Sequence, residues 1–291
     1  MVSFANVLVN AISISSLYAI VALGFTLIFG VGGVLNFSHG ALITIGAEAS
    51  YLISNQTNLG LHPALGVIGG MLTAAIVAAI LYLGVVRFVE DEPVTLLILT
   101  FIIGFFIQHA VRVFSSHGTG NFSVNQVTPG QTDIAGVSVF NIDITIFLLS
   151  MILIALTGVF VSQTKTGKAI LAVSMSDKGA AIVGIDARKI NLITWLLAGA
   201  FAGIAGVLLT MKNTGAWNMG TQPLILAFSI VILGGLGSIK GSVVGAYIIG
   251  FTETFTTQYI NSSLQGFTAL VLLIVFLLVK PEGLFGREAA E

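Results

Sequence analysis

Long apolar stretches alternate with short polar ones along almost the whole chain. A helix needs about 20 mainly apolar residues to cross the hydrocarbon core of a bilayer. The apolar stretches that approach this length are residues 8–34, 40–54, 64–86, 94–113, 142–162, 190–211, 223–238, 241–260 and 264–279. The pattern predicts an all-α, polytopic membrane helical bundle with eight or nine transmembrane segments.

Three of these stretches have special features. Residues 40–54 and 223–238 are short and carry glycine and polar residues, so either can be a broken or re-entrant helix. Residues 8–34 form a long stretch with a polar start. Because basic residues and a cleavage signal are missing before it, we interpret it as a retained span and not as a signal peptide.

Glycine spacing predicts how some of these helices pack. Gly199 and Gly203 are four residues apart, as are Gly241 and Gly245. Such pairs place small residues on one helix face and let two backbones approach closely. Tight packing is therefore the favoured interpretation over direct contact with a ligand.

The composition agrees with a membrane protein. Charged residues make up 8% of the chain, against about 25% in soluble domains. Residues 1–291 are interpreted as one transmembrane domain without an attached soluble domain. The net charge of −1 gives no sign of nucleic-acid binding, and zero cysteines exclude disulfides, cysteine-based zinc sites and thiol catalysis.

The segment 163–189 is the main polar interruption, and it holds five of the eleven basic residues. Positive charge marks the cytoplasmic side, because cationic loops resist translocation. Its middle, residues 169–183, is expected to form a short helix. We interpret the segment as a cytoplasmic coupling loop that grips a soluble partner. The candidate coupling residues are Lys165, Lys168, Ile170, Val173, Asp177, Lys178, Ala181 and Gly184.

The remaining charges are consistent with this orientation. The basic residues expected on the same inner face are Arg87, Lys240, Lys280 and Arg287. The opposite face would hold residues 114–141, an external loop without lysine or arginine that is expected to contain a hairpin. Nine spans would place the N-terminus outside, and eight would place it inside.

The run Asn36-Phe37-Ser38-His39-Gly40 is unusually polar for its position between two apolar segments. Asn36, Ser38 and His39 cost several kcal/mol each if they lie unpaired in lipid. The run is either a helix break that lines the permeation route or a cytoplasmic connector whose His39 lies in the headgroup region. Both alternatives remain open on the sequence.

Two acidic residues, Glu48 and Glu253, lie inside predicted spans. Such residues usually face the interior of a bundle. Glu253 is surrounded by threonines, which favours a polar seam on its helix. Each carboxylate lines the substrate pathway or makes a structural hydrogen bond to another helix.

Motifs for enzymatic chemistry are missing. The four histidines, at 39, 62, 109 and 117, lack the spacing of metal ligands. Residues 234–242 resemble a phosphate loop only loosely, because Lys240 follows isoleucine and precedes glycine. The chain is therefore expected to have no cofactor, no ATPase site and no catalytic residues.

Four motifs in order resemble the permeases of branched-chain amino acid ABC importers, the LivH type. They are residues 16–30 with 36–40, residues 166–185, residues 233–241 and residues 280–287. Ser38 stands where the family usually has alanine, and Lys240 stands where it often has proline. The similarity covers nearly the whole chain.

The resemblance implies a fold of eight or so helices and a set of partners. These are a second, homologous permease subunit, two cytoplasmic ATPase subunits that bind ATP, and an extracytoplasmic substrate-binding protein. Leucine, isoleucine and valine are the expected cargo, with urea or short amides as alternatives. The basic residues of segment 163–189 would steer the ATPase, and Ile170, Val173, Ile182 and Val183 would anchor it. The alternative class of protein is a stand-alone channel or carrier. It differs from an importer subunit in that it would transport its cargo without ATP.

Overall fold

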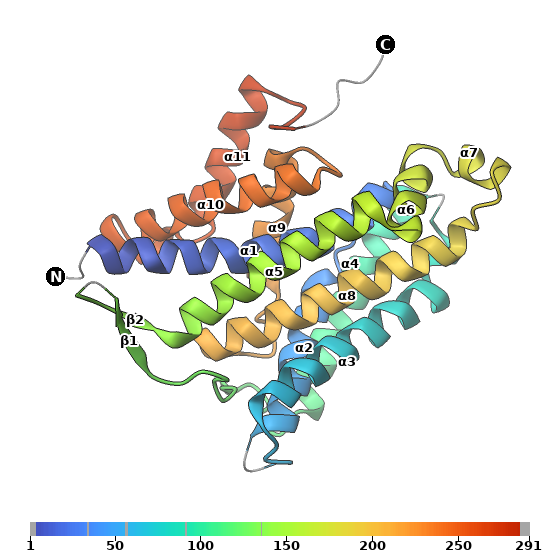
Figure 1. Ribbon diagram of the computed structural model, residues 1–291. Coiled ribbons are helices and arrows are strands. Elements are labelled where there is room, and N and C mark those ends of the chain that lie inside the picture. The colour runs from blue at the N-terminus through green and yellow to red at the C-terminus, as the bar shows by residue number, and fades with distance from the viewer. Residues whose placement is uncertain (1–3, 34, 56–57, 91, 135, 286–291) are drawn as a thin grey trace.

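The computed structural model of the chain describes residues 4–33, 35–55, 58–90, 92–134 and 136–285. The described chain is mainly helical and contains one short β-hairpin between the helices Pro93–Phe114 and Asn141–Gln163 (Figure 1). The helices are α1 (Phe4–Gly32), α2 (His39–Ser54), α3 (Pro63–Gly84), α4 (Pro93–Phe114), α5 (Asn141–Gln163), α6 (Lys165–Met175), α7 (Asp177–Ile182), α8 (Ala187–Lys212), α9 (Thr221–Gly234), α10 (Ile239–Tyr259) and α11 (Phe267–Val279). Two 3-10 turns, Val86–Phe88 and Ser262–Leu264, complete the helical elements.

Five helices of the described chain are long and apolar enough to cross a bilayer alone: α1, α3 with its 3-10 extension, α4, α5 and α8. Helices α9 and α10 meet at a bend of 120° and would make a sixth span if counted together. The expected eight or nine crossings are therefore not confirmed. The expectation that residues 223–238 belong to a broken or re-entrant element agrees with this bend.

Helix α1 lies at the centre of the bundle. It is apolar on all sides, and almost all of its residues from Ser13 to Ile28 are buried. It packs against α5, α8, α9 and α10 (Figure 1). A helix without a polar face is stable only when it is enclosed, which explains the long apolar stretch at 8–34.

Glycines set the closest helix contacts, as their spacing predicted. A Cβ on Gly199 would lie 2.6 Å from Ala74 O, and one on Gly203 would lie 2.5 Å from Gly70 O, both on α3. A Cβ on Gly245 would lie 2.8 Å from Ile230 O on α9. The prediction of tight packing is confirmed on both helices.

The hairpin expected in residues 114–141 is present. Strand β1 (Gln131–Ile134) pairs antiparallel with β2 (Val137–Phe140). Upstream of it, Phe122 and Gly215 exchange backbone hydrogen bonds of 3.0 and 2.8 Å. These bonds tie the loop to the segment that follows α8.

The ends of the bundle are assigned by the charge rule of membrane proteins. The exposed basic residues of α6 and α7 mark the inner end, and Val31 near the end of α1 packs there against Ile170, Ala180 and Ile190. On this assignment, which remains a prediction, the N-terminus of α1, the hairpin and the end of α8 lie at the opposite end, which we call the outer end. Lys280 follows α11 near the end of α9, where Leu284 N donates to Leu233 O at 2.9 Å. Arg287, expected on the inner face, lies outside the described residues.

Candidate functional site

The polar run at 36–39 starts helix α2 inside the bundle. Asn36 Oδ1 accepts hydrogen bonds from Ser38 N at 3.0 Å and from Ser38 Oγ at 2.6 Å, which closes a local turn. His39 is fully buried, and its Nε2 lies 3.3 Å from Val21 O on α1. Val21 precedes Gly32 by eleven residues, which is about 16 Å along a helix. His39 therefore lies near mid-depth and not in the headgroup region.

A second short helix begins at the same place. Gly220, just before α9, donates its N–H to Thr44 Oγ1 of α2 at 3.2 Å. A Cβ on Gly40 would lie only 2.6 Å from Gly220 O. The 16 residues of α2 and the 14 of α9 span about 24 and 21 Å, less than the ~30 Å hydrocarbon core. Both are half-helices, and their N-termini meet in the interior.

Glu48 connects α2 to the external loop. Its Oε2 lies 2.7 Å from His117 Nε2. The His117 ring stacks on Phe122 at a centroid distance of 4.4 Å and meets Tyr51 edge-on. Glu48 is 8% exposed, so this contact fastens residues of the loop to a buried helix face.

Glu253 holds the start of α11. Its Oε1 accepts a hydrogen bond from Gly266 N at 2.6 Å, and Gly266 is the residue before the helix. The side chain is nearly fully buried. The five residues expected to line a substrate pathway thus fall in three places: Asn36, Ser38 and His39 at the half-helices, Glu48 at the external loop and Glu253 beside α11. That they line a pathway remains a prediction.

The segment 163–189 contains two helices and not the single one expected. Ser176 is extended, with φ −167°, and separates α6 from α7. Its Oγ accepts a hydrogen bond from Gly179 N at 3.0 Å, so it caps α7. Gly184 ends α7 with a positive φ of 82°, a conformation that favours glycine.

Two of the expected partner anchors face the protein itself. Ile170 and Val173 are each 3% exposed and pack with Val31, Ala180 and Ile190. The expectation that these two side chains anchor a partner is therefore wrong. Their spacing of three residues marks the face of α6 that joins the bundle.

Other apolar residues of α6 and α7 are exposed instead. Ile182 and Val183, which were also expected as anchors, are 86% and 72% exposed. Met175 is 73% exposed, and Leu171 is partly exposed. We call these four residues the exposed apolar patch. The surrounding residues Lys165, Lys168, Asp177, Lys178 and Ala181 are exposed as well.

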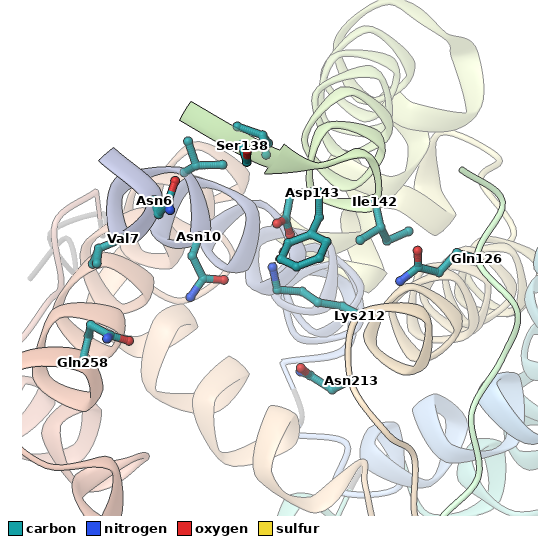
Figure 2. A pocket seen from close by; sticks show the side chains of 13 residues that line it. Asn6, Val7, Asn10, Gln126, Ser138, Ile142, Asp143, Lys212, Asn213 and Gln258 are labelled. Carbon is teal, nitrogen blue, oxygen red and sulfur yellow. Dashed lines mark hydrogen bonds and ion pairs between the residues drawn. The ribbon is translucent and has the colours of Figure 1, made fainter. Parts of the chain in front are cut away.

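A cavity of about 400 Å³ opens at the outer end of the bundle (Figure 2). A buried ion pair between Lys212 Nζ, at the end of α8, and Asp143 Oδ1, in the first turn of α5, lies on its wall. Ser13 Oγ of α1 donates to the same oxygen at 2.8 Å, and Lys212 Nζ donates to Ser13 Oγ at 3.2 Å. The other lining residues are Asn6, Val7, Val9, Asn10, Gln126, Ser138, Val139, Phe140, Ile142, Asn213 and Gln258.

Sequence reasoning missed this cavity. Asp143 and Lys212 are 69 residues apart and each lies at the end of a span. Charged residues at span ends are ordinary interfacial residues, so the only signal was their place at the outer ends of two spans. Among the described residues, no three histidine or acidic side chains are grouped to hold a metal.

A family model and curated relatives of this chain point to the same family of membrane proteins. A family model described as "Branched-chain amino acid transport system / permease component" matches residues 7–279. The high-affinity branched-chain amino acid transport system permease protein LivH of Escherichia coli K12 is 28% identical, over 99% of this chain and 97% of its own. The corresponding protein BraD of Pseudomonas aeruginosa is 30% identical, over 98% and 96%.

One solved structure shares the fold. PsaBC from Streptococcus pneumoniae in complex with Fab matches with a TM-score of 0.54 and 15% identity. The match covers 95% of this chain and 92% of that one. At this identity the likeness supports the architecture and carries no information on cargo.

Proposed function

The chain belongs to the family of branched-chain amino acid transport permease components, and from this premise we propose that it forms the translocation pathway of an ATP-binding-cassette importer for leucine, isoleucine and valine. The match of the family model to residues 7–279 carries the proposal. The resemblance stated from the four sequence motifs is confirmed at the level of the family. The chain is a multi-pass protein of the inner membrane.

We propose that the partners are a second permease subunit, two cytoplasmic ATPase subunits and an extracytoplasmic binding protein. ATP would be bound by the ATPase subunits, because this sequence has no phosphate loop. The whole chain, residues 1–291, would then act as one permease domain without a catalytic site of its own.

The exposed apolar patch on α6 and α7 supports docking of an ATPase at the inner end. Ile182 and Met175 expose large side chains to water on two helices that also carry exposed lysines. An apolar centre with a charged rim is typical of protein interfaces. Lys165, Lys168 and Lys178 would steer the partner by long-range attraction.

Helix α6 is firmly joined to the membrane helices, so it can transmit a movement of the partner. A Cβ on Gly167 would lie 2.5 Å from Val161 Cα, which shows that α6 touches the backbone of α5. Ile170 and Val173 join it to α1 through Val31. Packed elements of this kind shift as rigid bodies and do not deform continuously.

The test is uptake of radiolabelled L-leucine by cells that lack their own branched-chain importers. Cells that produce the chain with its ATPase, second permease and binding protein should accumulate leucine, and removal of the ATPase should abolish uptake. Leucine transport by the chain alone, reconstituted in vesicles, would contradict the proposal and favour a stand-alone carrier.

A cross-linking experiment tests the docking surface separately. A photoreactive residue at exposed Ala181 should form a product with the ATPase subunit in the assembled complex. The same residue at Ile134, exposed on the external hairpin, is the matched control and should give none. Absence of a product from Ala181 in a complex that hydrolyses ATP would show that α7 is not the docking element.

A further inference from the structure

We propose that the outer cavity binds the transported amino acid on its way in, with Lys212 holding the α-carboxylate and Asp143 holding the α-ammonium group. This inference rests on the proposed function, since it assumes an amino acid as cargo. It adds a defined binding site at the outer end of the bundle, where cargo released by a binding protein would arrive.

The ion pair has unused capacity for a ligand. Among the residues that the structure describes, both hydrogen bonds to the Asp143 carboxylate fall on Oδ1, from Ser13 Oγ and Lys212 Nζ. Oδ2 therefore remains for an ammonium group. Lys212 Nζ has three protons and uses two, toward Asp143 and Ser13. The third remains for a carboxylate.

A purely structural role explains the pair less well. Two charges buried beneath a membrane surface are costly, and a pair of apolar residues often stabilises a protein as well or better. Such residues in membrane proteins usually mark a pathway for substrate or ions. Lys212 and Asp143 have side chains only 11% and 8% exposed, yet both line the cavity.

The rest of the lining matches an amino acid of zero net charge. The lining residues other than the ion pair are uncharged, and five are amides that offer both donors and acceptors: Asn6, Asn10, Gln126, Asn213 and Gln258. Asn6 Oδ1 is buried without a hydrogen-bond partner among the described residues, so it can accept a bond from a ligand. A ligand with only one charge would add an uncompensated charge to this neutral ion pair.

An apolar part of the same cavity suits a branched side chain. Val7, Val139 and Ile142 are 2 to 5% exposed and belong to its lining. A volume of about 400 Å³ lies in the lower part of the range for small-molecule sites, about 300–1,000 Å³. In Figure 2 the side chains of Asp143 and Lys212 point toward one another on one wall, while Asn6, Val7 and Gln258 lie on another side.

The experiment measures binding directly. The full chain in lipid nanodiscs is titrated with L-leucine, with isopentylamine, which lacks the carboxylate, and with 4-methylpentanoate, which lacks the ammonium group, and saturation-transfer NMR reports the bound ligand. Leucine should bind to the wild type at least about tenfold more tightly than either analogue, because each charged hydrogen-bonded contact is worth about that factor. Equal binding of all three would overturn the proposal.

Variants locate the site. The double variant Lys212→Met with Asp143→Asn removes both charges without leaving one unpaired, and it should weaken leucine binding at least about tenfold. Asn10→Phe fills the cavity, leaves the ion pair intact and should have the same effect. The matched double variant Lys280→Met with Glu92→Gln, two exposed positions outside the cavity, should bind as the wild type does.

The outcomes separate the two proposals. If leucine binds and Asn10→Phe and the Lys212/Asp143 double variant bind it equally well, the cavity assignment is wrong and the cargo assignment stands. If the wild type binds neither leucine nor valine but binds a polar amino acid through Lys212 and Asp143, the assignment of the cavity as an amino acid site is supported. The proposal that the cargo is a branched-chain amino acid is then wrong. If the double variant misfolds, Asn10→Phe still tests the proposal, because it keeps the ion pair.

Discussion

The contact between the two half-helices leads to a sharp prediction at Gly40. Replacement by alanine puts a Cβ 2.6 Å from Gly220 O and 3.2 Å from Leu224 Cβ. Ordinary van der Waals separation is about 3.5 Å or more. Helices α2 and α9 must therefore move apart by about 1 Å, which also strains the hydrogen bond from Gly220 N to Thr44 Oγ1.

The magnitude follows from three contributions. Overpacking a tight contact costs about 1–3 kcal/mol, and loss of one buried hydrogen bond costs about 1 kcal/mol. The better helix propensity of alanine returns up to about 1 kcal/mol. Gly40→Ala should therefore destabilise the protein by about 1–3 kcal/mol.

Gly158 provides a matched control in the interior of α5. A Cβ at Gly158 would meet nothing within 4 Å, so Gly158→Ala should gain up to about 1 kcal/mol of helix propensity without a clash. The two variants therefore differ by about 1–4 kcal/mol in stability. At about 2–4 °C per kcal/mol for a chain of this length, their melting temperatures should differ by about 2–16 °C. Purified protein in detergent micelles is suitable for this measurement.

Leucine uptake is the second readout. Gly40→Ala should lower uptake at equal expression, because the half-helices no longer meet as they do in the native protein, whereas Gly158→Ala should transport normally. Thr44→Val removes the hydrogen bonds that Thr44 Oγ1 accepts from Gly220 N and donates to Gly40 O, and it should cost about 1–3 kcal/mol because Gly220 N loses its acceptor. If Gly40→Ala and Gly158→Ala melt within about 2 °C of each other and transport equally, the close contact at mid-depth does not stabilise the fold.

Three further changes test the inner and outer ends. Gly167→Leu should push α6 away from α5 and reduce leucine uptake while leucine binding to the nanodisc-held chain is retained; normal uptake would refute the coupling role of this contact. The double variant Met175→Ser with Ile182→Ser should lower co-purification of the ATPase at least about tenfold, because two apolar anchors are lost. Its melting temperature should stay unchanged, since both side chains are exposed. His117→Ala leaves Glu48 buried without its partner and should lower the free energy of unfolding by about 1–3 kcal/mol. The external loop should then be cleaved faster by a protease, and an unchanged rate of cleavage would show that other contacts hold the loop.

The sequence predicted an all-helical membrane bundle because hydropathy indicates which residues leave water, but the expected eight or nine spans were not confirmed. The basic segment 163–189, the external hairpin and the close glycine contacts all followed from local rules of charge and size. Hydropathy does not indicate, however, how deep in the membrane a helix begins. Residues 40–54 are apolar whether α2 crosses the whole core or starts beside Val21, so only the contact of His39 with that carbonyl reveals a half-helix.

The same limit explains the errors on α6. A helix that joins two bodies has two apolar faces, and both repeat with helical spacing. Ile170 and Val173 lie on the face that packs on α1, while Leu171 and Met175 lie on the exposed face. The sequence shows both sets and gives no rule for which one meets the partner. Only the position of the neighbouring helix α1, which contacts α6 through Val31, decides between them.

The outer cavity shows why candidate sites are harder to predict than spans. The candidates predicted from the sequence were Glu48 and Glu253 inside apolar stretches and the polar run 36–39 between two such stretches, because unpaired polar groups are costly in lipid. These groups bond mainly within the protein: Asn36 to Ser38, Glu48 to His117 and Glu253 to Gly266. Lys212 and Asp143 looked ordinary because span ends commonly carry charge. They become unusual only when the fold buries them together beside a cavity. Glu48 Oε1 and Glu253 Oε2 are also buried without a hydrogen-bond partner among the described residues, so spare bonding capacity alone does not single out a site. What distinguishes Lys212 and Asp143 is that they combine this capacity with a place on the wall of a cavity.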